Sequence, residues 1–374
     1  MTSASRLVTL MLAVLGTGMV SRPIAMAAEL QQRIDELVVA EMQTQKIPGV
    51  AVAVFTAGKP MLMKGYGFAN VEHEAPVTPA SVFHSASVGK QFTAVAIMLL
   101  VEDGKLGLDN SIRTYFPDAP LSWQPITIRH LLTHTSGIPD YFDVMGTNGI
   151  APYDSRHDYA PDELRGIFYT LPLIFDAGSD FSYSNTGYAL LGFLIEKVTG
   201  QFYGDLLRDR LFRPLGMPSA VVVSESDIVP GRVAGYELVN DELKNEEWYT
   251  PTNNTADGAL YLSLLDYHAW DRALRERAIL RDASWDEIYS AVRLNDGRLY
   301  PYGFGWNIDA SQGAPWYHHS GGWLGFNLLI SRYLANGITI VVLSNLDLAK
   351  SAIIVDGIAG IIGPGMAQLL PRAE

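Results

Sequence analysis

The segment Phe83-His-Ser-Ala-Ser-Val-Gly-Lys90 directs the interpretation of this sequence, because Ser87 is the only serine followed by a lysine three residues later. The apolar run that follows it ends at Gly104, which predicts a buried helix over residues 87–103. Residues three apart share a helix face, so the Lys90 amine would lie beside the Ser87 hydroxyl and could take its proton. An isolated Ser-x-x-Lys is better explained by an N-cap serine and a solvated lysine, so the pattern needs support from other motifs.

A second candidate motif is Tyr183-Ser184-Asn185, the only Tyr-x-Asn in the chain, which directly precedes a predicted helix over residues 186–199. A tyrosine whose pKa is lowered by the nearby Lys90 can act as general base and then as general acid. The Asn185 amide can orient a substrate carbonyl. Alternatively, Asn185 caps the helix and Tyr183 is a packing residue. The residues alone leave both interpretations open.

A third candidate motif, His319-Ser320-Gly321-Gly322, lies between two strand-like runs. Consecutive glycines let a substrate backbone approach a strand edge closely. The N–H of Gly322 can then serve, beside that of Ser87, as a second oxyanion donor. His319 can contact a substrate carboxylate or tune the tyrosine. The alternative is a glycine turn in a hairpin with a solvated histidine.

The N-terminal residues 1–27 have the pattern of an export signal. Arg6 precedes the apolar stretch Leu7 to Val20, and Ala25-Met26-Ala27 fits a small-x-small cleavage site. The apolar stretch is too short to span a bilayer comfortably. The sequence therefore predicts a periplasmic or secreted protein with no stable membrane insertion after signal cleavage. The chain contains no cysteine, so neither a lipid-modified cysteine nor a disulfide is expected.

The charge of the chain excludes some partners. The formal net charge is −13, and it becomes −15 when the loss of residues 1–27 removes Arg6 and Arg22. A chain this acidic is unsuited to binding nucleic acid. With 48 % hydrophobic and 18 % charged residues, the composition is that of an ordinary globular protein.

The order of the predicted elements indicates an α+β fold. Strand-like runs occur near both ends, at 50–55, 60–66, 302–308, 316–319, 326–332 and 338–344, and helical patterns dominate the middle, including 258–276 and 283–293. This order predicts one mixed antiparallel sheet built from both termini and flanked by helices, with an all-helical lobe inserted. We expect a single domain over residues 28–374. Its α/β lobe covers about 28–85 and 295–374, its helical lobe covers about 86–294, and a cleft lies between them.

The three motifs occur in the order found in the serine β-lactamase and penicillin-binding-protein superfamily, and the chain resembles that superfamily over about residues 30–362. It is most similar to the branch that holds class C β-lactamases, low-molecular-weight D,D-peptidases, family VIII esterases and D-amino-acid peptidases. The flanking segments that carry the resemblance are Gly65–Asn70, Gly104–Asp109, His130–Gly137, Ser184–Gly192 and Tyr302–Trp306.

The resemblance implies a β-lactamase/transpeptidase-like fold and a role for each motif. Ser87 would be the acylated nucleophile, and Lys90 and Tyr183 its proton-handling partners. Asn185 would position the substrate, and His319, Ser320, Gly321 and Gly322 would line the strand edge of the site. No cofactor is implied. The substrate would be a small ester, a peptide or a β-lactam.

One departure from the family pattern bears on the substrate. Class C β-lactamases have Lys-Thr-Gly where this chain has His319-Ser320-Gly321. A lysine is a permanent cation for a drug carboxylate, whereas a histidine is mostly neutral at pH 7. This favours an esterase or a D-amino-acid peptidase with at most weak β-lactamase activity. The alternatives are a β-lactamase proper and a penicillin-binding or cell-wall-binding protein without turnover.

Two other hydrolase classes fit the sequence poorly. His130 and His134 have the spacing of a helix-borne zinc motif, but Leu131 stands where that motif needs a glutamate. We therefore expect no metal site. The Gly-x-Ser-x-Gly of α/β-hydrolases is also missing, since Ser85-Ala86-Ser87-Val88-Gly89 is the nearest match.

Overall fold

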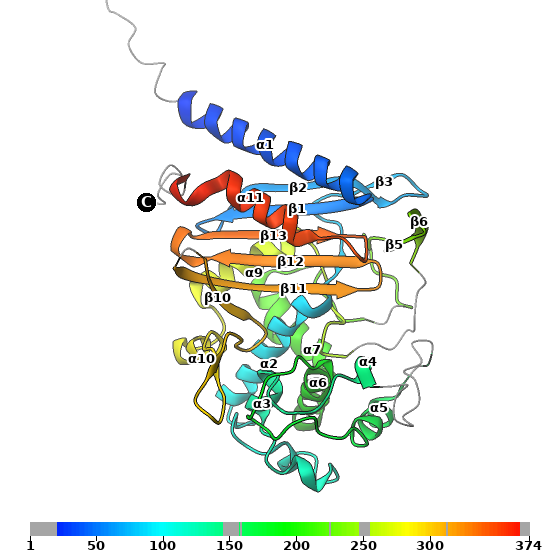
Figure 1. Ribbon diagram of the computed structural model, residues 1–374, viewed down its shortest axis with the longest axis vertical. Helices are drawn as coiled ribbons and strands as arrows, with labels where there is room; N and C mark the ends of the chain where they lie inside the picture. The colour runs from blue at the N-terminus through cyan, green and yellow to red at the C-terminus, as the bar shows by residue number, and fades with distance from the viewer. Residues whose placement is uncertain are drawn as a thin grey trace, which may run out of the picture.

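A seven-stranded antiparallel sheet forms the upper half of the molecule in the computed structural model (Figure 1). The structure describes residues 21–144, 157, 159–223, 226–246, 255–311 and 313–366. The strand order β10-β11-β12-β13-β1-β2-β3 places strands from both ends of the chain side by side, which confirms the predicted α+β architecture. The strands of this sheet are β1 (Gly49–Thr56), β2 (Lys59–Asn70), β3 (Ala75–Pro76), β10 (Asn307–Ser311), β11 (Ala314–Trp323), β12 (Phe326–Tyr333) and β13 (Ile338–Ser344).

The centre of the sheet is the pair β1 and β13, which runs in register from Val50↔Ser344 to Thr56↔Ile338. Both strands are buried on both faces, as their β-branched sequences predict. Successive residues point to opposite faces, so Val50, Val52 and Val54 enter one hydrophobic core. Their neighbours Ala51, Ala53 and Phe55 enter the other.

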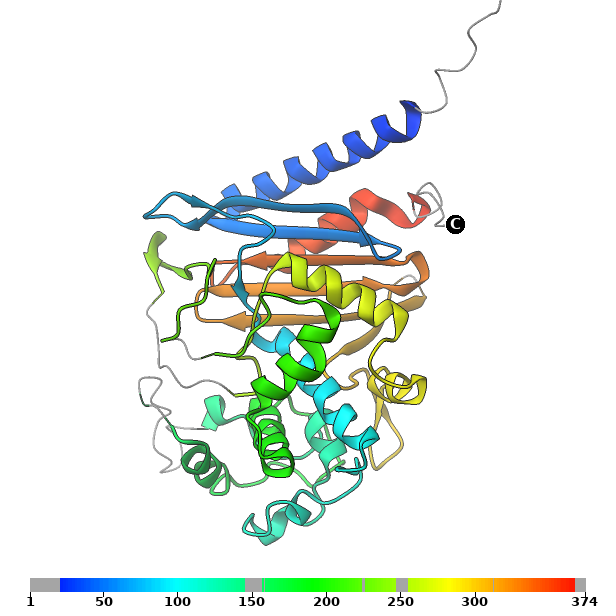
Figure 2. The ribbon, with the colours of Figure 1, turned by 180° about the vertical axis from the view of Figure 1, so that it is seen from behind.

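Helices cover both faces of the sheet. Helices α1 (Ser21–Gln45) and α11 (Ser351–Met366) pack against each other on one face, drawn blue and red in Figure 1. Helix α9 (Leu264–Glu276) packs on β1, β2 and β13 from the other face, which is turned toward the viewer in Figure 2. The bounds of the domain and of its two lobes remain a prediction. The predicted helical lobe, about 86–294, includes α9, although this helix packs on the sheet.

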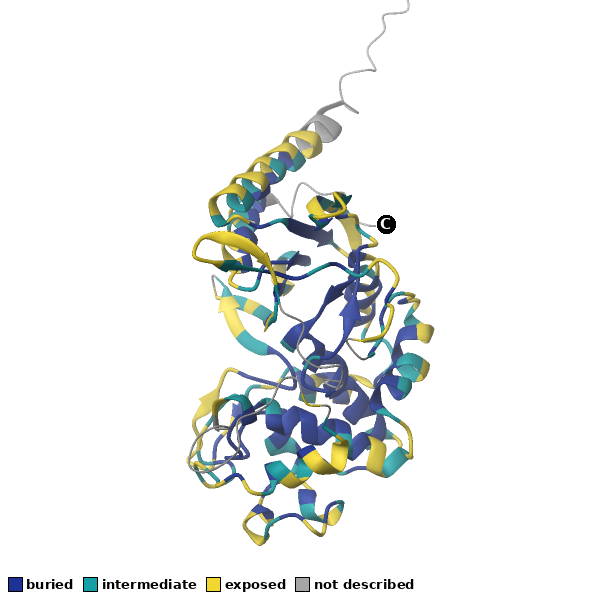
Figure 3. Ribbon diagram, turned by 90° about the vertical axis from the view of Figure 1, so that its right-hand side faces the viewer, coloured by how far each residue is buried: buried dark blue, intermediate teal, exposed yellow. Residues whose placement is uncertain are grey.

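The lower half of the molecule is mainly helical, and its centre is as thoroughly buried as the sheet (Figure 3). Helix α2 (Lys90–Glu102) runs through that centre and is buried at every position from Lys90 to Leu100. It packs against α6 (Asn185–Thr199), which ends at Gly200 in the left-handed conformation. The other helices are α3 (Ile128–Leu132), α4 (Tyr141–Val144), α5 (Pro161–Phe168), α7 (Tyr203–Leu207), α8 (Arg213–Leu215) and α10 (Asp282–Ile288).

Three two-stranded ladders and five short helical turns complete the described elements. The ladders are β4 (Phe83–His84) with β7 (Tyr261–Leu262), β5 (Tyr236–Val239) with β6 (Glu242–Asn245), and β8 (Val292–Arg293) with β9 (Leu299–Tyr300). The turns are η1 (Ala86–Gly89), η2 (Ile112–Thr114), η3 (Leu121–Trp123), η4 (Arg208–Phe212, a π-helical turn) and η5 (Leu334–Asn336).

Several predicted elements differ from the structure. The predicted helix over 283–293 ends at Ile288, and Val292–Arg293 form strand β8 instead. The predicted helix over 258–276 begins only at Leu264, because Ser263 and Asp266 form a capping box there and Tyr261–Leu262 pair with β4. The predicted strand over 302–308 is a strand only from Asn307. Tyr302 is instead buried, and its hydroxyl lies within hydrogen-bond distance of His134 and His319.

The predicted export signal, residues 1–27, lies largely outside the described residues, because the first residue that the structure describes is Ser21, at the start of helix α1. That helix covers the predicted cleavage site. Among the helices that the structure describes, none combines the length and the apolar character needed to cross a membrane.

Candidate active site

The candidate nucleophile lies in a tight turn between the sheet and the helical lobe. Ser87 belongs to the 3-10 turn η1, and helix α2 begins only at Lys90, so the predicted helix over 87–103 starts three residues later than expected. Ala86 has a φ of 45°, a left-handed conformation that costs energy in a residue with a side chain. Glycines pack around the turn: a Cβ at Gly258 would come within 2.8 Å of the Ala86 carbonyl, and one at Gly321 within 2.7 Å of Ser85 O.

Lys90 is fully buried, and its Nζ contacts three oxygens. These are Ser87 Oγ at 3.0 Å, Asn185 Oδ1 at 2.7 Å and the backbone oxygen of Asp257 at 2.6 Å. The last two oxygens can only accept, so a neutral amine would direct its two N–H groups at them and its lone pair at Ser87. Burial lowers the pKa of Lys90 to about 8, which favours that neutral form.

Hydrogen bonds to Lys90 and Asp140 hold the Asn185 side chain in one orientation. Its Oδ1 accepts from Lys90, and its Nδ2 donates to Asp140 Oδ2 at 2.7 Å. The backbone N–H of Asn185 donates to the same Asp140 oxygen at 2.8 Å. Burial raises the pKa of Asp140, although these hydrogen bonds oppose the shift. The N-cap of α6 is Ser184, whose side chain accepts a hydrogen bond from Gly187 N–H. Asn185 therefore does not cap this helix, which was the alternative interpretation of its position in the sequence.

Tyr183 lies beside Lys90, but its environment differs from the expected one. The Lys90 Nζ is 4.9 Å from the centre of the Tyr183 ring. The hydroxyl of Tyr183 is buried and makes no hydrogen bond with a described residue. Burial raises the pKa of Tyr183 well above its usual value, although the nearby Ser87 hydroxyl opposes the shift. The expectation that Lys90 lowers this pKa is therefore wrong, because loss of solvation outweighs the neighbouring charge.

His319 is buried beneath the site rather than exposed in it. Its Nδ1 lies 2.6 Å from Ser320 O, and its Nε2 lies 2.9 Å from Tyr302 Oη. Tyr302 Oη also lies 3.2 Å from Nε2 of His134, whose Nδ1 accepts from Ser184 N–H. Burial lowers the pKa of His319 to about 3. Burial also lowers the pKa of His134 well below its usual value, so both histidines are neutral at pH 7. His134 then donates to Tyr302, Tyr302 donates to His319, and His319 donates to Ser320 O.

Both ring nitrogens of His319 are thus engaged within the protein, which leaves neither for the expected contact with a substrate carboxylate. The His134 ring packs on the Tyr183 ring with centroids 4.2 Å apart. His134 was considered as a metal ligand from the sequence, and it instead belongs to this buried chain. His130 accepts a hydrogen bond from Thr127 N–H and so completes the cap of α3.

Ser320, Gly321 and Gly322 form the strand edge that the sequence predicts. β10 pairs with β11 only as far as His318, so the outer edge of β11 beyond this residue faces η1 rather than another strand of the sheet. Ser320 and Gly322 are exposed and Gly321 is buried. Gly322 lines the pocket, as its proposed role requires.

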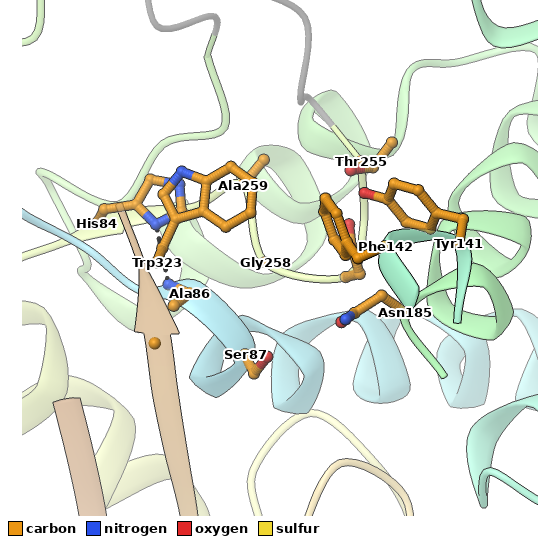
Figure 4. A pocket seen from close by; sticks show the side chains of 12 residues that line it. His84, Ala86, Ser87, Tyr141, Phe142, Asn185, Thr255, Gly258, Ala259 and Trp323 are labelled. Carbon is orange, nitrogen blue, oxygen red and sulfur yellow. Dashed lines mark hydrogen bonds between the residues drawn. The ribbon is translucent and has the colours of Figure 1, made fainter. Parts of the chain in front are cut away.

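A cavity of about 140 Å³ opens over Ser87 (Figure 4). Tyr141 and Phe142 lie above Asn185 on one side, and His84 and Trp323 lie on the other. Burial lowers the pKa of His84 to about 3, so this histidine is neutral as well. The cavity is lined by His84, Ala86, Ser87, Tyr141, Phe142, Asn185, Thr255, Asp257, Gly258, Ala259, Gly322 and Trp323.

Several residues of the site were not found from the sequence. Asp140, Asp257 and His84 lie in segments without regular periodicity, and no spacing links them to Ser87 or Tyr183. His84 is three residues before Ser87, and its Nδ1 accepts from Ala86 N–H at 3.0 Å. The signal in the sequence that could have indicated His84 is its position in the segment Phe83–Lys90, which also contains Ser87.

The sheet and the inserted helices are those of the β-lactamase/transpeptidase-like superfamily. The chain belongs to the Beta-lactamase family, whose model matches residues 34–356. It is 32 % identical to a penicillin-binding protein of Bacillus subtilis (strain 168), over 75 % of this chain and 64 % of that protein. It is also 32 % identical to a D-aminopeptidase of Gluconobacter oxydans (strain 621H), over 69 % of this chain and 48 % of that protein. The chain thus spans about half to two thirds of the length of these relatives.

Solved structures share the fold over nearly the whole chain. The octameric penicillin-binding-protein homologue of Pyrococcus abyssi is similar with a TM-score of 0.76 and 29 % identity, over 91 % of this chain and 79 % of that one. The D-amino acid amidase of Ochrobactrum anthropi SV3, complexed with L-phenylalanine amide, has a TM-score of 0.78 at 24 % identity, over 89 % of this chain and 98 % of that one.

Proposed function

We propose that the protein is a serine hydrolase that cleaves an amide or ester through an acyl-enzyme on Ser87. The observation that carries the proposal is the environment of the Lys90 amine. Two of its three neighbours, Asn185 Oδ1 and Asp257 O, can only accept hydrogen bonds, so the lone pair of a neutral amine is left to face Ser87 Oγ. A neutral Lys90 then accepts the Ser87 proton while Oγ attacks the substrate carbonyl.

The remaining groups have roles in the same cycle. The N–H groups of Ser87 and Gly322 hold the oxyanion. The proton returns to the leaving amine or alcohol through Lys90 and the Tyr183 hydroxyl, which burial keeps protonated at neutral pH. Water then attacks the acyl-enzyme, and the same groups return Ser87 to its starting state.

The substrate we propose is an amide, peptide or ester of the D-amino-acid type, rather than a β-lactam. The D-aminopeptidase relative supports this choice. The neutral, buried His319 supports it too, because it offers a drug carboxylate no fixed charge. We also propose that residues 1–27 are an export signal and that the protein acts in the periplasm or outside the cell, as their apolar pattern indicates.

The test is acylation of the purified protein by a fluorophosphonate probe, followed by three substrates: a short-chain p-nitrophenyl ester, a D-Ala-D-Ala peptide and a chromogenic cephalosporin. We expect labelling at Ser87 and turnover of the ester or the peptide. Ser87→Ala should abolish both and keep the fold, because the Ser87 side chain caps neither η1 nor α2. Near wild-type hydrolysis by Ser87→Ala would show that the nucleophile is another residue.

A further inference from the structure

We propose that the Asp257 carboxylate recognises a free ammonium group on the substrate, which would make the enzyme selective for aminoacyl amides and esters with an unblocked amine. This inference rests on the proposed function and names the substrate class of the same site. It assigns to Asp257 a specificity role in addition to the contact that its backbone makes with Lys90.

The first support is the position of Asp257. The residue lines the cavity over Ser87, yet only 8 % of its surface is exposed. Its carboxylate makes no hydrogen bond or ion pair with any residue that the structure describes. An acidic residue with so little exposed surface normally has a partner for its charge. A cationic ligand group would supply that partner.

The second support is the balance of charge around the cavity. Asp140 is the other acid, and its carboxylate already accepts from the Asn185 amide and from Phe142 N–H. The neighbouring histidines, His84 and His319, are neutral at pH 7. Lys90 is the nearest cation, and it must be neutral to accept the Ser87 proton. When the enzyme is ready to react, the described part of the site therefore carries net negative charge, which attracts a cation and repels a substrate carboxylate.

The third support is the aromatic wall. Tyr141, Phe142 and Trp323 line the cavity, with the Phe142 and Trp323 ring centres 5.7 Å apart. The faces of such rings attract cations, and the same wall can hold an apolar side chain. An acidic group beside aromatic rings is therefore suited to the ammonium and the side chain of one amino acid.

The geometry also sets where the ammonium would be on the substrate. Asp257 O is 2.6 Å from the Lys90 Nζ, which is 3.0 Å from Ser87 Oγ. The backbone of Asp257 thus lies beside the amine that contacts Ser87, so the Asp257 side chain starts close to the reacting carbonyl. In an aminoacyl group the α-nitrogen is only two bonds, about 2.5 Å, from the carbonyl carbon. An α-ammonium therefore fits the site better than a cation on a long side chain.

The experiment compares p-nitroanilides of D-phenylalanine with a free amine, with an N-acetyl group, and with the amine replaced by hydrogen. We expect wild type to have the lowest KM for the free amine. The ratio of KM values between the acetylated and the free substrate should collapse about 10- to 100-fold in Asp257→Asn, because a charge-assisted hydrogen bond is lost. Glu196→Gln removes an exposed charge from α6 and should keep the wild-type ratio.

The outcomes separate this inference from the proposed function. Equal KM values for the three anilides in wild type would overturn the ammonium site, and this result does not depend on whether Asp257→Asn folds. An unchanged ratio in a folded Asp257→Asn would overturn it as well. If Ser87 is neither labelled by the fluorophosphonate nor acylated by any anilide, the proposed function itself fails.

Discussion

Lys90 is the residue on which the proposed chemistry of the site depends. It is buried on the first turn of α2, and its ring neighbours Tyr183 and Tyr188 lie 4.9 and 5.5 Å from its nitrogen. Burial disfavours the ammonium, and the nearby carboxylates of Asp257 and Asp140 favour it. The balance leaves the pKa of Lys90 at about 8, close enough to neutral pH for a general base to be both available and basic.

This pKa predicts how activity depends on pH. Below about pH 8 the amine of Lys90 is mostly protonated and cannot accept the Ser87 proton, so kcat/KM should rise with pH and level off above that value. The measurement is a pH–rate profile with a neutral ester, whose own charge does not change over the range. A profile that is already flat from pH 6 upward would show that Lys90 is not the base.

The residues that sequence reasoning found and missed differ in one physical respect. Ser87 and Lys90 are linked by one helical turn, so their proximity follows from spacing alone. Asp140 reaches Asn185 across 45 positions of chain, and Asp257 reaches Lys90 across 167. Contacts over such separations depend on how lobes pack, which no local pattern encodes.

At the scale of elements, β11 and the turn η1 are fitted closely to each other. A side chain at Gly321 would meet Ser85 O and Ser87 N at 2.7 and 3.2 Å. These are backbone atoms, which cannot swing away as the end of a side chain can. By contrast, a Cβ at the next residue, Gly322, would meet nothing within 4 Å.

These two glycines form a matched pair for mutation. Gly321→Ala should push β11 away from the turn, lower kcat about 100-fold through misplacement of Ser87, and destabilise the fold by about 1–3 kcal/mol. Gly322→Ala keeps its backbone N–H and should leave the free energy of unfolding within about 1 kcal/mol of wild type. Urea unfolding and ester kinetics on both variants give the comparison. Equal stability losses in the two would contradict the packing described here.

Elements with strong periodicity were predicted well, and their boundaries less well. The runs at 50–55 and 338–344 are strands, and 186–199 is a helix, because continuous β-branched runs and a single apolar face are local signals. The strand expected at 302–308 begins late because Tyr302 is taken up in a hydrogen-bond chain with His134 and His319. A tertiary contact there overrides local propensity.

At the scale of the whole molecule, three buried neutral histidines make the fold sensitive to acid. Burial lowers the pKa of His84 and of His319 to about 3, and that of His134 well below its usual value. In the unfolded chain each has a pKa of about 6.5. Between these values the unfolded state binds protons that the folded state does not, so stability decreases as the pH falls below 6.5.

For His84 and His319 the expected size of this effect is about 1.4 kcal/mol per histidine for each pH unit, or about 2 kcal/mol each at pH 5. Urea unfolding at several pH values between about 7 and 5 measures it. His319→Asn should reduce the slope of stability against pH, whereas His73→Asn, at an exposed position, should not. Identical slopes in wild type and His319→Asn would show that His319 is not kept neutral by burial.

The pairing of β1 with β13 has a consequence for the timing of synthesis. The strand that carries the His319–Gly322 edge joins β1 only through β12 and β13. A ribosome that has released the helical lobe and β11, but not residues 338–344, therefore holds a chain in which β11 is not yet joined to β1 and has no fixed place beside the Ser87 turn. Contacts this distant in sequence form late and slowly. If the proposed function holds, we therefore expect no hydrolytic activity from the nascent chain until translation has passed Ser344.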